Sequence, residues 1–60
     1  MMAKFVIKVD RAGEFRWALF APNGEIVAVS EGYSSKQSAI DTVNRIKYYA
    51  ASANIVDLTI

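Results

Sequence analysis

The alternation of apolar and polar residues over the first third of the chain constrains its fold more than any other feature. Residues 4–10 and residues 14–21 both carry apolar side chains at every second position, a period typical of β-strands that bury one face. Residues 11–13 lie between them, and Gly13 can adopt the positive φ that a three-residue hairpin loop requires. In this register one face collects the large apolar residues Phe5, Ile7, Val9, Phe15, Trp17 and Leu19. A slip of one residue would separate them, so the pattern predicts both the hairpin and its register.

The second of these strands ends in the strongest turn signal of the chain, at residues 22–24. The Asn-Gly pair at its tip is typical of a two-residue type I′ loop, in which both central residues have positive φ. A third antiparallel strand is therefore predicted over residues 25–30. The predicted pairs across this turn are Ala21 with Ile26, Leu19 with Ala28 and Trp17 with Ser30.

A helix is predicted over residues 35–50, because apolar residues recur there at spacings of three and four. The predicted stripe consists of Ala39, Ile40, Val43, Ile46 and Ala50. Ser34 is predicted as the N-cap, with Gln37 three positions further on to complete a capping box. Asn54 is predicted to end the helix by adopting the left-handed conformation.

Residues 55–60 alternate again and predict a fourth strand. Because an exposed strand of this kind would pair with other chains, we expect it to be paired inside a sheet. The predicted fold is α+β, a β-β-β-α-β unit forming one domain over residues 1–60. Its antiparallel sheet is expected to carry the helix on the face with Phe5, Ile7, Trp17, Leu19 and Ile26.

A chain of 60 residues with no Cys and no His has few ways to stabilise so small a core. Folding at this size buries only about 60% of the unfolded surface, and disulfides and the usual zinc sites are excluded. The hydrophobic content of 53% therefore indicates apolar surface that needs a partner. The net charge of +1 is no nucleic-acid footprint. We expect a cytoplasmic protein without a membrane partner, because no signal peptide or membrane-length apolar run is present.

Five short stretches of this sequence form a specific combination. They are Phe5-x-Ile7, Gly13-x-Phe15-Arg16-Trp17-x-Leu19, Asn23-Gly24-x-Ile26-Val27-Ala28-x-Ser30, Gly32-Tyr33-x-Ser35-Lys36 and Ile55-Val56-Asp57-Leu58-Thr59. In this combination nearly the whole chain resembles the YegP-like family of small bacterial domains of unknown function. The resemblance implies a homodimer in which two β3-α-β units build one continuous sheet and exchange their C-terminal strands. The exchanged strand would contain Val56, Leu58 and Ile60. The family supplies no catalytic residues, so none is transferred to this chain.

The sheet face opposite the helix is the first candidate site. It is predicted to carry the basic and apolar residues Lys4, Val6, Lys8, Arg16, Ala18, Phe20, Val27 and Val29. Three interpretations stay open: a partly solvated face, a patch for a protein partner, and a weak platform for single-stranded nucleic acid. The platform would use Lys4, Lys8, Arg16 and Phe20, but one aromatic residue makes it a weak nucleic-acid candidate.

The start of the predicted helix is the second candidate site. Ser34, Ser35 and Lys36 could hold an anion at the free backbone N–H groups, and a plain N-cap is the alternative interpretation. Trp17 is predicted as a core anchor rather than a ligand-stacking residue. Without His or Cys the common nucleophile and general-base arrangements are missing. We therefore expect no enzyme and no cofactor, but a structural or interaction module that acts as a homodimer.

Overall fold

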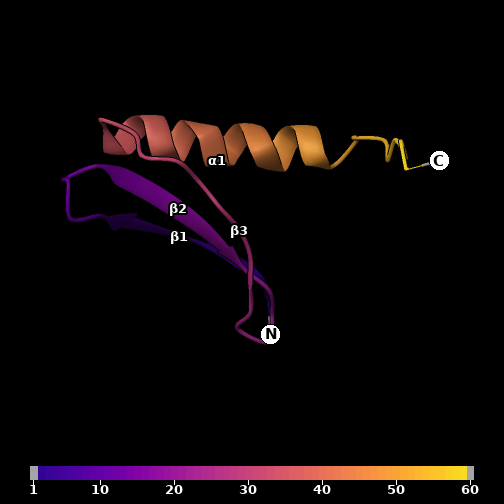
Figure 1. Ribbon diagram of the computed structural model, residues 1–60, viewed down its shortest axis with the longest axis horizontal. Coiled ribbons are helices and arrows are strands. Elements are labelled where there is room, and N and C mark those ends of the chain that lie inside the picture. The colour runs from indigo at the N-terminus through magenta and orange to yellow at the C-terminus, as the bar shows by residue number, and fades with distance from the viewer. Residues whose placement is uncertain (1, 60) are drawn as a thin grey trace.

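The computed structural model describes residues 2–59 and contains three strands followed by one helix (Figure 1). The elements are β1 (Lys4–Val9), β2 (Phe15–Phe20), β3 (Ile26–Val29) and α1 (Lys36–Ala50). The strands form an antiparallel sheet in the order β1-β2-β3, and α1 lies across one face of it. The predicted α+β fold is confirmed as far as three strands and one covering helix. Across the part of the chain that is described, no helix is long and apolar enough to cross a bilayer.

The hairpin formed by β1 and β2 has the predicted loop and register. Gly13 has a φ of 80°, and the Asp10 N–H donates to the Glu14 carbonyl oxygen at 2.8 Å to close the loop. The predicted pairs are all present: Phe5 opposite Leu19, Ile7 opposite Trp17 and Val9 opposite Phe15. Alternation alone was sufficient to predict the register of this hairpin, because only one register places every large apolar side chain on one face.

The loop between β2 and β3 differs from the predicted type I′ loop. Gly24 has a φ of 90°, but no described residue other than glycine has a positive φ, so Asn23 does not adopt the I′ conformation. The Gly24 N–H donates to the Ala21 carbonyl oxygen at 2.9 Å, and the Ala21 N–H donates to the Glu25 carbonyl oxygen at 2.8 Å. These bonds define a three-residue loop in which Pro22 opens the turn. Proline has a φ near −65°, which suits the first central position of a type I turn, so the turn begins one residue early.

The longer loop changes the register at the beginning of β3. Phe20 lies opposite Ile26, whereas the predicted partner of Ile26 was Ala21. A bulge between Leu19 and Phe20 absorbs the extra residue, and beyond it Leu19 lies opposite Ala28 as predicted. Ile26 therefore shares the face of Phe20, away from the helix, and its predicted place on the helix-covered face is wrong.

The core is small and lies between α1 and the β1–β2 hairpin. Trp17, Ala39 and Val43 are buried, and the Phe5 ring packs edge to face on Trp17 with ring centroids 5.5 Å apart. α1 lies against β1 and β2, but no Cα atom of α1 comes within 8 Å of one in β3. All four residues of β3 are exposed.

The N-terminus of α1 is capped one residue later than predicted. Ser35, not Ser34, has the extended backbone of an N-cap, and its Oγ accepts a hydrogen bond from the Ser38 N–H at 3.1 Å. The predicted capping box is also absent, because the Gln37 side chain donates forward to Asp41 at 2.9 Å instead of back to the cap.

The chain beyond α1 forms no strand over residues 51–59. Ala51 ends the helix in the right-handed conformation, and Asn54 does not take up the predicted left-handed one. Residues 53–59 then run away from the sheet, past the end of the helix (Figure 1). The strand predicted over residues 55–60 is therefore not formed within the chain, because no edge of its own sheet lies beside it. Ile60 lies outside the described residues.

Candidate functional site

The face of the sheet away from α1 brings together the four residues predicted as a binding platform. On β1 and β2, Lys4 lies opposite Phe20, and Lys8 lies opposite Arg16. Because side chains alternate along each strand, all four belong to the same face. The register of the β1–β2 hairpin therefore places all four side chains on one surface.

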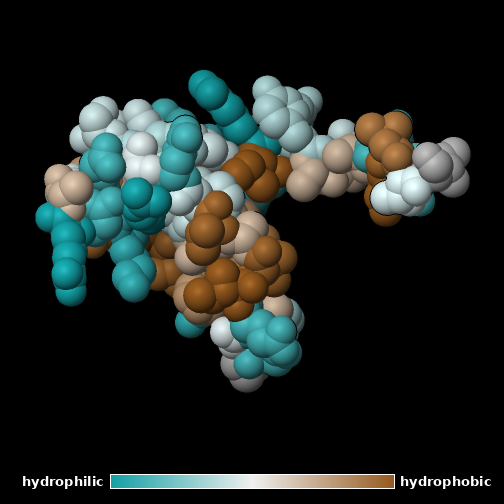
Figure 2. Space-filling model, viewed as in Figure 1, coloured by the Kyte–Doolittle hydropathy of each residue, from teal (hydrophilic) through white to brown (hydrophobic). Residues whose placement is uncertain are grey.

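A groove of about 480 Å³ runs along this face, and we call it the open-face groove. Its apolar lining includes Ala18, Phe20, Ile26 and Val29. Its charged lining consists of Lys8, Asp10, Arg11 and Arg16, whereas Lys4 and Val27 do not contribute. Figure 2 shows hydrophobic side chains gathered over the lower part of β3, below the helix. The groove thus combines an apolar part with a mainly basic part.

Ile26 is the lining residue that the sequence prediction missed. It was placed on the helix-covered face by an uninterrupted register, and the bulge moves it to the groove. The signal available in the sequence was Pro22 directly before Asn-Gly, because proline favours the first central position of a turn. A one-residue change in loop length was therefore enough to move a side chain between faces.

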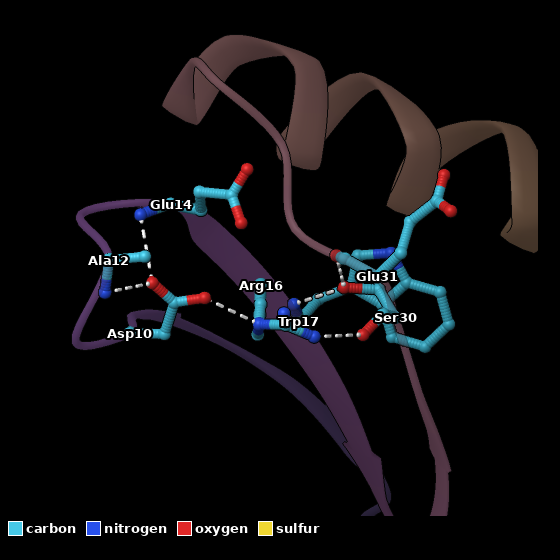
Figure 3. Close-up of polar contacts among 7 residues, drawn as sticks. All are labelled: Asp10, Ala12, Glu14, Arg16, Trp17, Ser30 and Glu31. Carbon is cyan, nitrogen blue, oxygen red and sulfur yellow. Dashed lines mark hydrogen bonds and ion pairs between the residues drawn. The ribbon is translucent and has the colours of Figure 1, made fainter.

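Asp10 organises the charged end of the groove (Figure 3). One of its carboxylate oxygens accepts hydrogen bonds from the Ala12 and Glu14 N–H groups, both at 2.9 Å. The other oxygen accepts from Arg16 Nε at 2.7 Å, and this contact is an ion pair. The Arg16 side chain, followed by the Glu14 backbone N–H, lowers the pKa of Asp10 below its ordinary value. Asp10 therefore stabilises the loop in its ionised form.

Arg16 is held in place by its neighbours on two strands. Besides the ion pair, its Nη1 donates to the Ser30 carbonyl oxygen at 3.2 Å, which links β2 to the residue after β3 (Figure 3). The hydrogen bond to Asp10 raises the pKa of Arg16, and the charges of Glu14 and Glu31 act in the same direction. Arg16 is thus paired within the chain, with Asp10 and with the Ser30 carbonyl oxygen.

Trp17 confirms its predicted role as a core anchor, because it is 9% exposed and packs against Phe5. Its backbone N–H donates to Ser30 Oγ at 2.9 Å (Figure 3). The indole Nε1–H, in contrast, is buried and has no acceptor among the described residues. A buried donor without a partner costs about 1–3 kcal/mol, so this group marks a place where an acceptor would stabilise the fold.

The residues of the predicted anion site lie together at the start of α1. The Ser35 hydroxyl is already used, because it accepts from the Ser38 N–H and donates to Ser38 Oγ at 2.8 Å. Ser34 and Lys36 are exposed on either side of it. The plain N-cap accounts for these contacts, and the anion site remains a prediction.

The C-terminal segment, residues 55–59, carries the residues predicted for strand exchange. Val56 is 73% and Leu58 is 84% exposed, and Figure 2 shows a second group of hydrophobic side chains on this projecting part. The Asp57 carboxylate accepts hydrogen bonds from the N–H and hydroxyl of Thr59, and these bonds lower the pKa of Asp57. The two apolar side chains, which flank Asp57 in the sequence, thus extend into solvent.

No group of three potential metal-ligating side chains converges within residues 2–59. The acidic side chains with resolved contacts serve local structure: Asp10 bonds to its loop and Arg16, Glu25 to Asn23, Asp41 to Gln37 and Asp57 to Thr59. The arrangement of the described residues can bind through shape and charge.

Residues 10–57 match the model of a family described as a domain of unknown function, DUF1508. The chain is 50% identical over 58 residues to a UPF0339 protein of Agrobacterium fabrum, covering 97% of this chain and 94% of the relative. It is 40% identical over 57 residues to a UPF0339 protein of Methanosarcina acetivorans, covering 95% and 98%. None of these descriptions names a function.

Two solution NMR structures have the same fold. A protein from Haloferax volcanii superimposes with a TM-score of 0.82 at 38% identity, covering 93% of this chain and 95% of that one. A protein from Agrobacterium tumefaciens gives a TM-score of 0.79 at 50% identity, covering 97% and 94%. The relatives thus come from both bacteria and archaea.

Proposed function

The chain belongs to the DUF1508 family, and with no function known for that family we propose that it acts as a homodimeric interaction module. This membership confirms the predicted YegP-like resemblance and extends it from bacteria to archaea. In the proposed dimer, the C-terminal segment of each chain adds as a strand to the sheet of the other. The observation that carries the proposal is the projection of residues 55–59 away from the body with Ile55, Val56 and Leu58 exposed.

β3 is the edge that suits an added strand. Its residues are all apolar and exposed, and α1 does not cover it. β1, the other edge, carries Lys4 and Lys8, and charged side chains on an edge strand discourage pairing. We therefore propose that the C-terminal segment of the second copy pairs with β3, where Val56 and Leu58 would extend the apolar surface.

The small core supports the same proposal. Only Trp17, Ala39 and Val43 are buried hydrophobic residues in the described part of the chain, and a domain of this size has little stability to spare. A second chain beside β3 would bury further apolar surface.

A non-enzymatic role in the cytoplasm is part of this proposal. The chain has no His and no Cys, and the contacts of its carboxylates are those of turns and of a helix. Nucleic acid is the weaker alternative on the open face, because the charge of Arg16 is compensated by Asp10. The anion site at the helix start has no support beyond its N-cap geometry.

Sedimentation equilibrium at low micromolar concentration tests the dimer. The full chain is expected to have twice the mass of one chain, and a variant without residues 55–60 is expected to lose both the dimer and cooperative unfolding. The truncated variant is compared with the full chain by circular dichroism at the same concentration. A truncated monomer that still unfolds cooperatively would contradict strand exchange, and a full-length folded monomer would contradict the dimer itself.

A further inference from the structure

The open-face groove has two chemically different ends. The end beside the β1–β2 loop is lined by Lys8 and Arg11, and the end beside the β2–β3 loop is lined by Phe20 and Ile26. Arg16 and Phe20 lie four positions apart on β2, so the two ends are separated by about 13 Å at roughly 3.3 Å per residue. A ligand must therefore present two different groups at that separation to use both ends.

The charged end has free positive charge. Asp10 is the one acidic residue of the lining, and its carboxylate already accepts hydrogen bonds from Arg16 and from two backbone N–H groups. Lys8 and Arg11 form no ion pair with any residue in the described range 2–59. Glu14 and Glu31 lie near enough to act on Arg16, but they do not line the groove. A carboxylate at Lys8 and Arg11 would thus meet uncompensated cations.

The apolar end provides a place for a large side chain. Ala18 is the small residue of the apolar part, and the larger side chains of Phe20, Ile26 and Val29 surround it in the lining. The volume of about 480 Å³ falls within the roughly 300–1,000 Å³ of ordinary ligand sites. Ile26 remains 60% and Val29 66% exposed, so both keep apolar surface available for contact.

We propose that the open-face groove binds an extended segment of another protein that carries an acidic residue about four positions from a large aliphatic or aromatic residue. The acidic side chain pairs with Lys8 and Arg11, and the apolar side chain lies against Phe20 and Ile26. The groove belongs to one chain, so this site does not depend on the proposed dimer. It gives the interaction module a partner of defined chemistry.

Single-stranded nucleic acid fits the same groove less well. It carries a phosphate at every nucleotide, whereas the free cations of the groove lie at one end. Phe20 is the one aromatic side chain of the lining outside the core, because the Trp17 indole is buried. Successive bases would therefore find neither successive stacking partners nor a continuous basic track.

A random peptide library displayed on phage and selected against the full chain tests the proposal. The selected peptides are expected to share an acidic residue about four positions from a large apolar one. A synthetic peptide of the most frequent sequence is then titrated by fluorescence anisotropy.

Ile26→Ser and Lys8→Glu are each expected to weaken its binding by about tenfold. Both positions are exposed, so these variants should fold. The matched control is Lys47→Glu, the same charge change on α1, which should keep the affinity within about twofold.

Four results with the selected peptides and with nucleic acid would overturn the proposal, and a competition experiment can give a fifth. The four are the selection of no common sequence, common sequences without an acidic residue, an affinity unchanged by both Ile26→Ser and Lys8→Glu, and salt-dependent binding of oligothymidine that is tighter than binding of the selected peptide. A synthetic peptide of residues 55–60 serves as competitor: if it displaces the selected peptide at equal concentration, the occupant is a second copy of this chain, which also overturns the proposal. Sedimentation of the same variants shows whether the dimer is intact, so failure at the groove is distinguished from failure of the dimer.

Discussion

The β1–β2 hairpin and the β3 strand belong to one sheet, but they are stabilised to different degrees. The hairpin is covered by α1, contains the buried Trp17 and is closed by the hydrogen bonds of Asp10. β3 is joined to β2 through a bulge, has no helix over it and is exposed along its whole length. The two halves of the sheet therefore differ in how much of their apolar surface the chain itself buries.

This difference indicates where the chain depends on a partner. In the hairpin half, every predicted contact is made by residues of the same chain. In the β3 half, apolar side chains on the strand and on residues 55–59 face solvent, and they lie on separate parts of the molecule. If the second half is completed by another chain, substitutions in the two halves should have different consequences. Those in the first should remove the fold at every protein concentration, whereas those in the second should weaken association, so that the fold is lost only where the dimer dissociates.

Trp17→Ala is expected to have the largest effect. Replacing a buried aromatic anchor by alanine costs about 3–5 kcal/mol, which is comparable to the entire stability of a small domain. The variant should show no cooperative unfolding transition by circular dichroism. Tyr48→Ala, at a side chain 78% exposed on α1, is the control and should stay within about 0.5 kcal/mol of the parent. A cooperative transition of Trp17→Ala near the parent temperature would show that the hairpin half does not carry the core.

A pair of substitutions on one side of the C-terminal segment addresses the β3 half. Val56 and Leu58 would share one face of a strand, and the double change Val56→Asp and Leu58→Asp puts two carboxylates on it. The dimer is expected to dissociate at concentrations at least about tenfold higher than for the parent, measured by sedimentation. The double change Ile55→Asp and Thr59→Asp, which puts two carboxylates on the alternate face, is the matched control. Equal loss of association in both variants would show that the segment does not pair as an alternating strand.

The same difference explains how much could be predicted from the sequence. The pairing of Ile7 with Trp17 follows from alternation, because all the groups that determine it lie within the one hairpin of residues 4–20. The position of Ile26 could not be obtained in this way, since it depends on whether Pro22 or Asn23 opens the turn. The pattern correctly predicts that the platform residues on β1 and β2 share one face. The place of Ile26 in the groove depends instead on the bulge between Leu19 and Phe20, which the pattern does not predict. The conformation of residues 55–59 depends on which surface they meet, and the local sequence pattern does not specify that surface.

Two aspartates, one in each half, allow a direct comparison of the two halves through their pKa values, with the smallest expected effect on stability. In the chain as described, the pKa of Asp10 is lowered by Arg16 and that of Asp57 by Thr59. A folded-state pKa below the unfolded value stabilises the fold above the ordinary pKa, and this contribution is lost as the pH falls through the ordinary value towards the lowered one. Asp10→Asn should therefore flatten the acid side of the stability profile measured by urea denaturation.

Asp57 should behave differently in the dimer. Its hydrogen bonds to Thr59 need a local fold of the chain back onto the Asp57 side chain. In a strand paired with β3, the Thr59 N–H would instead lie in the plane of the sheet, away from that side chain. We therefore expect a carbon-13 NMR titration of the side-chain carboxyl groups, at concentrations where the dimer is formed, to give a lowered pKa for Asp10 and an ordinary one for Asp57. Thr59→Val should leave the Asp57 titration unchanged. If the pKa of Asp57 is lowered in the dimer and Thr59→Val raises it, the turn persists and the segment is not an exchanged strand.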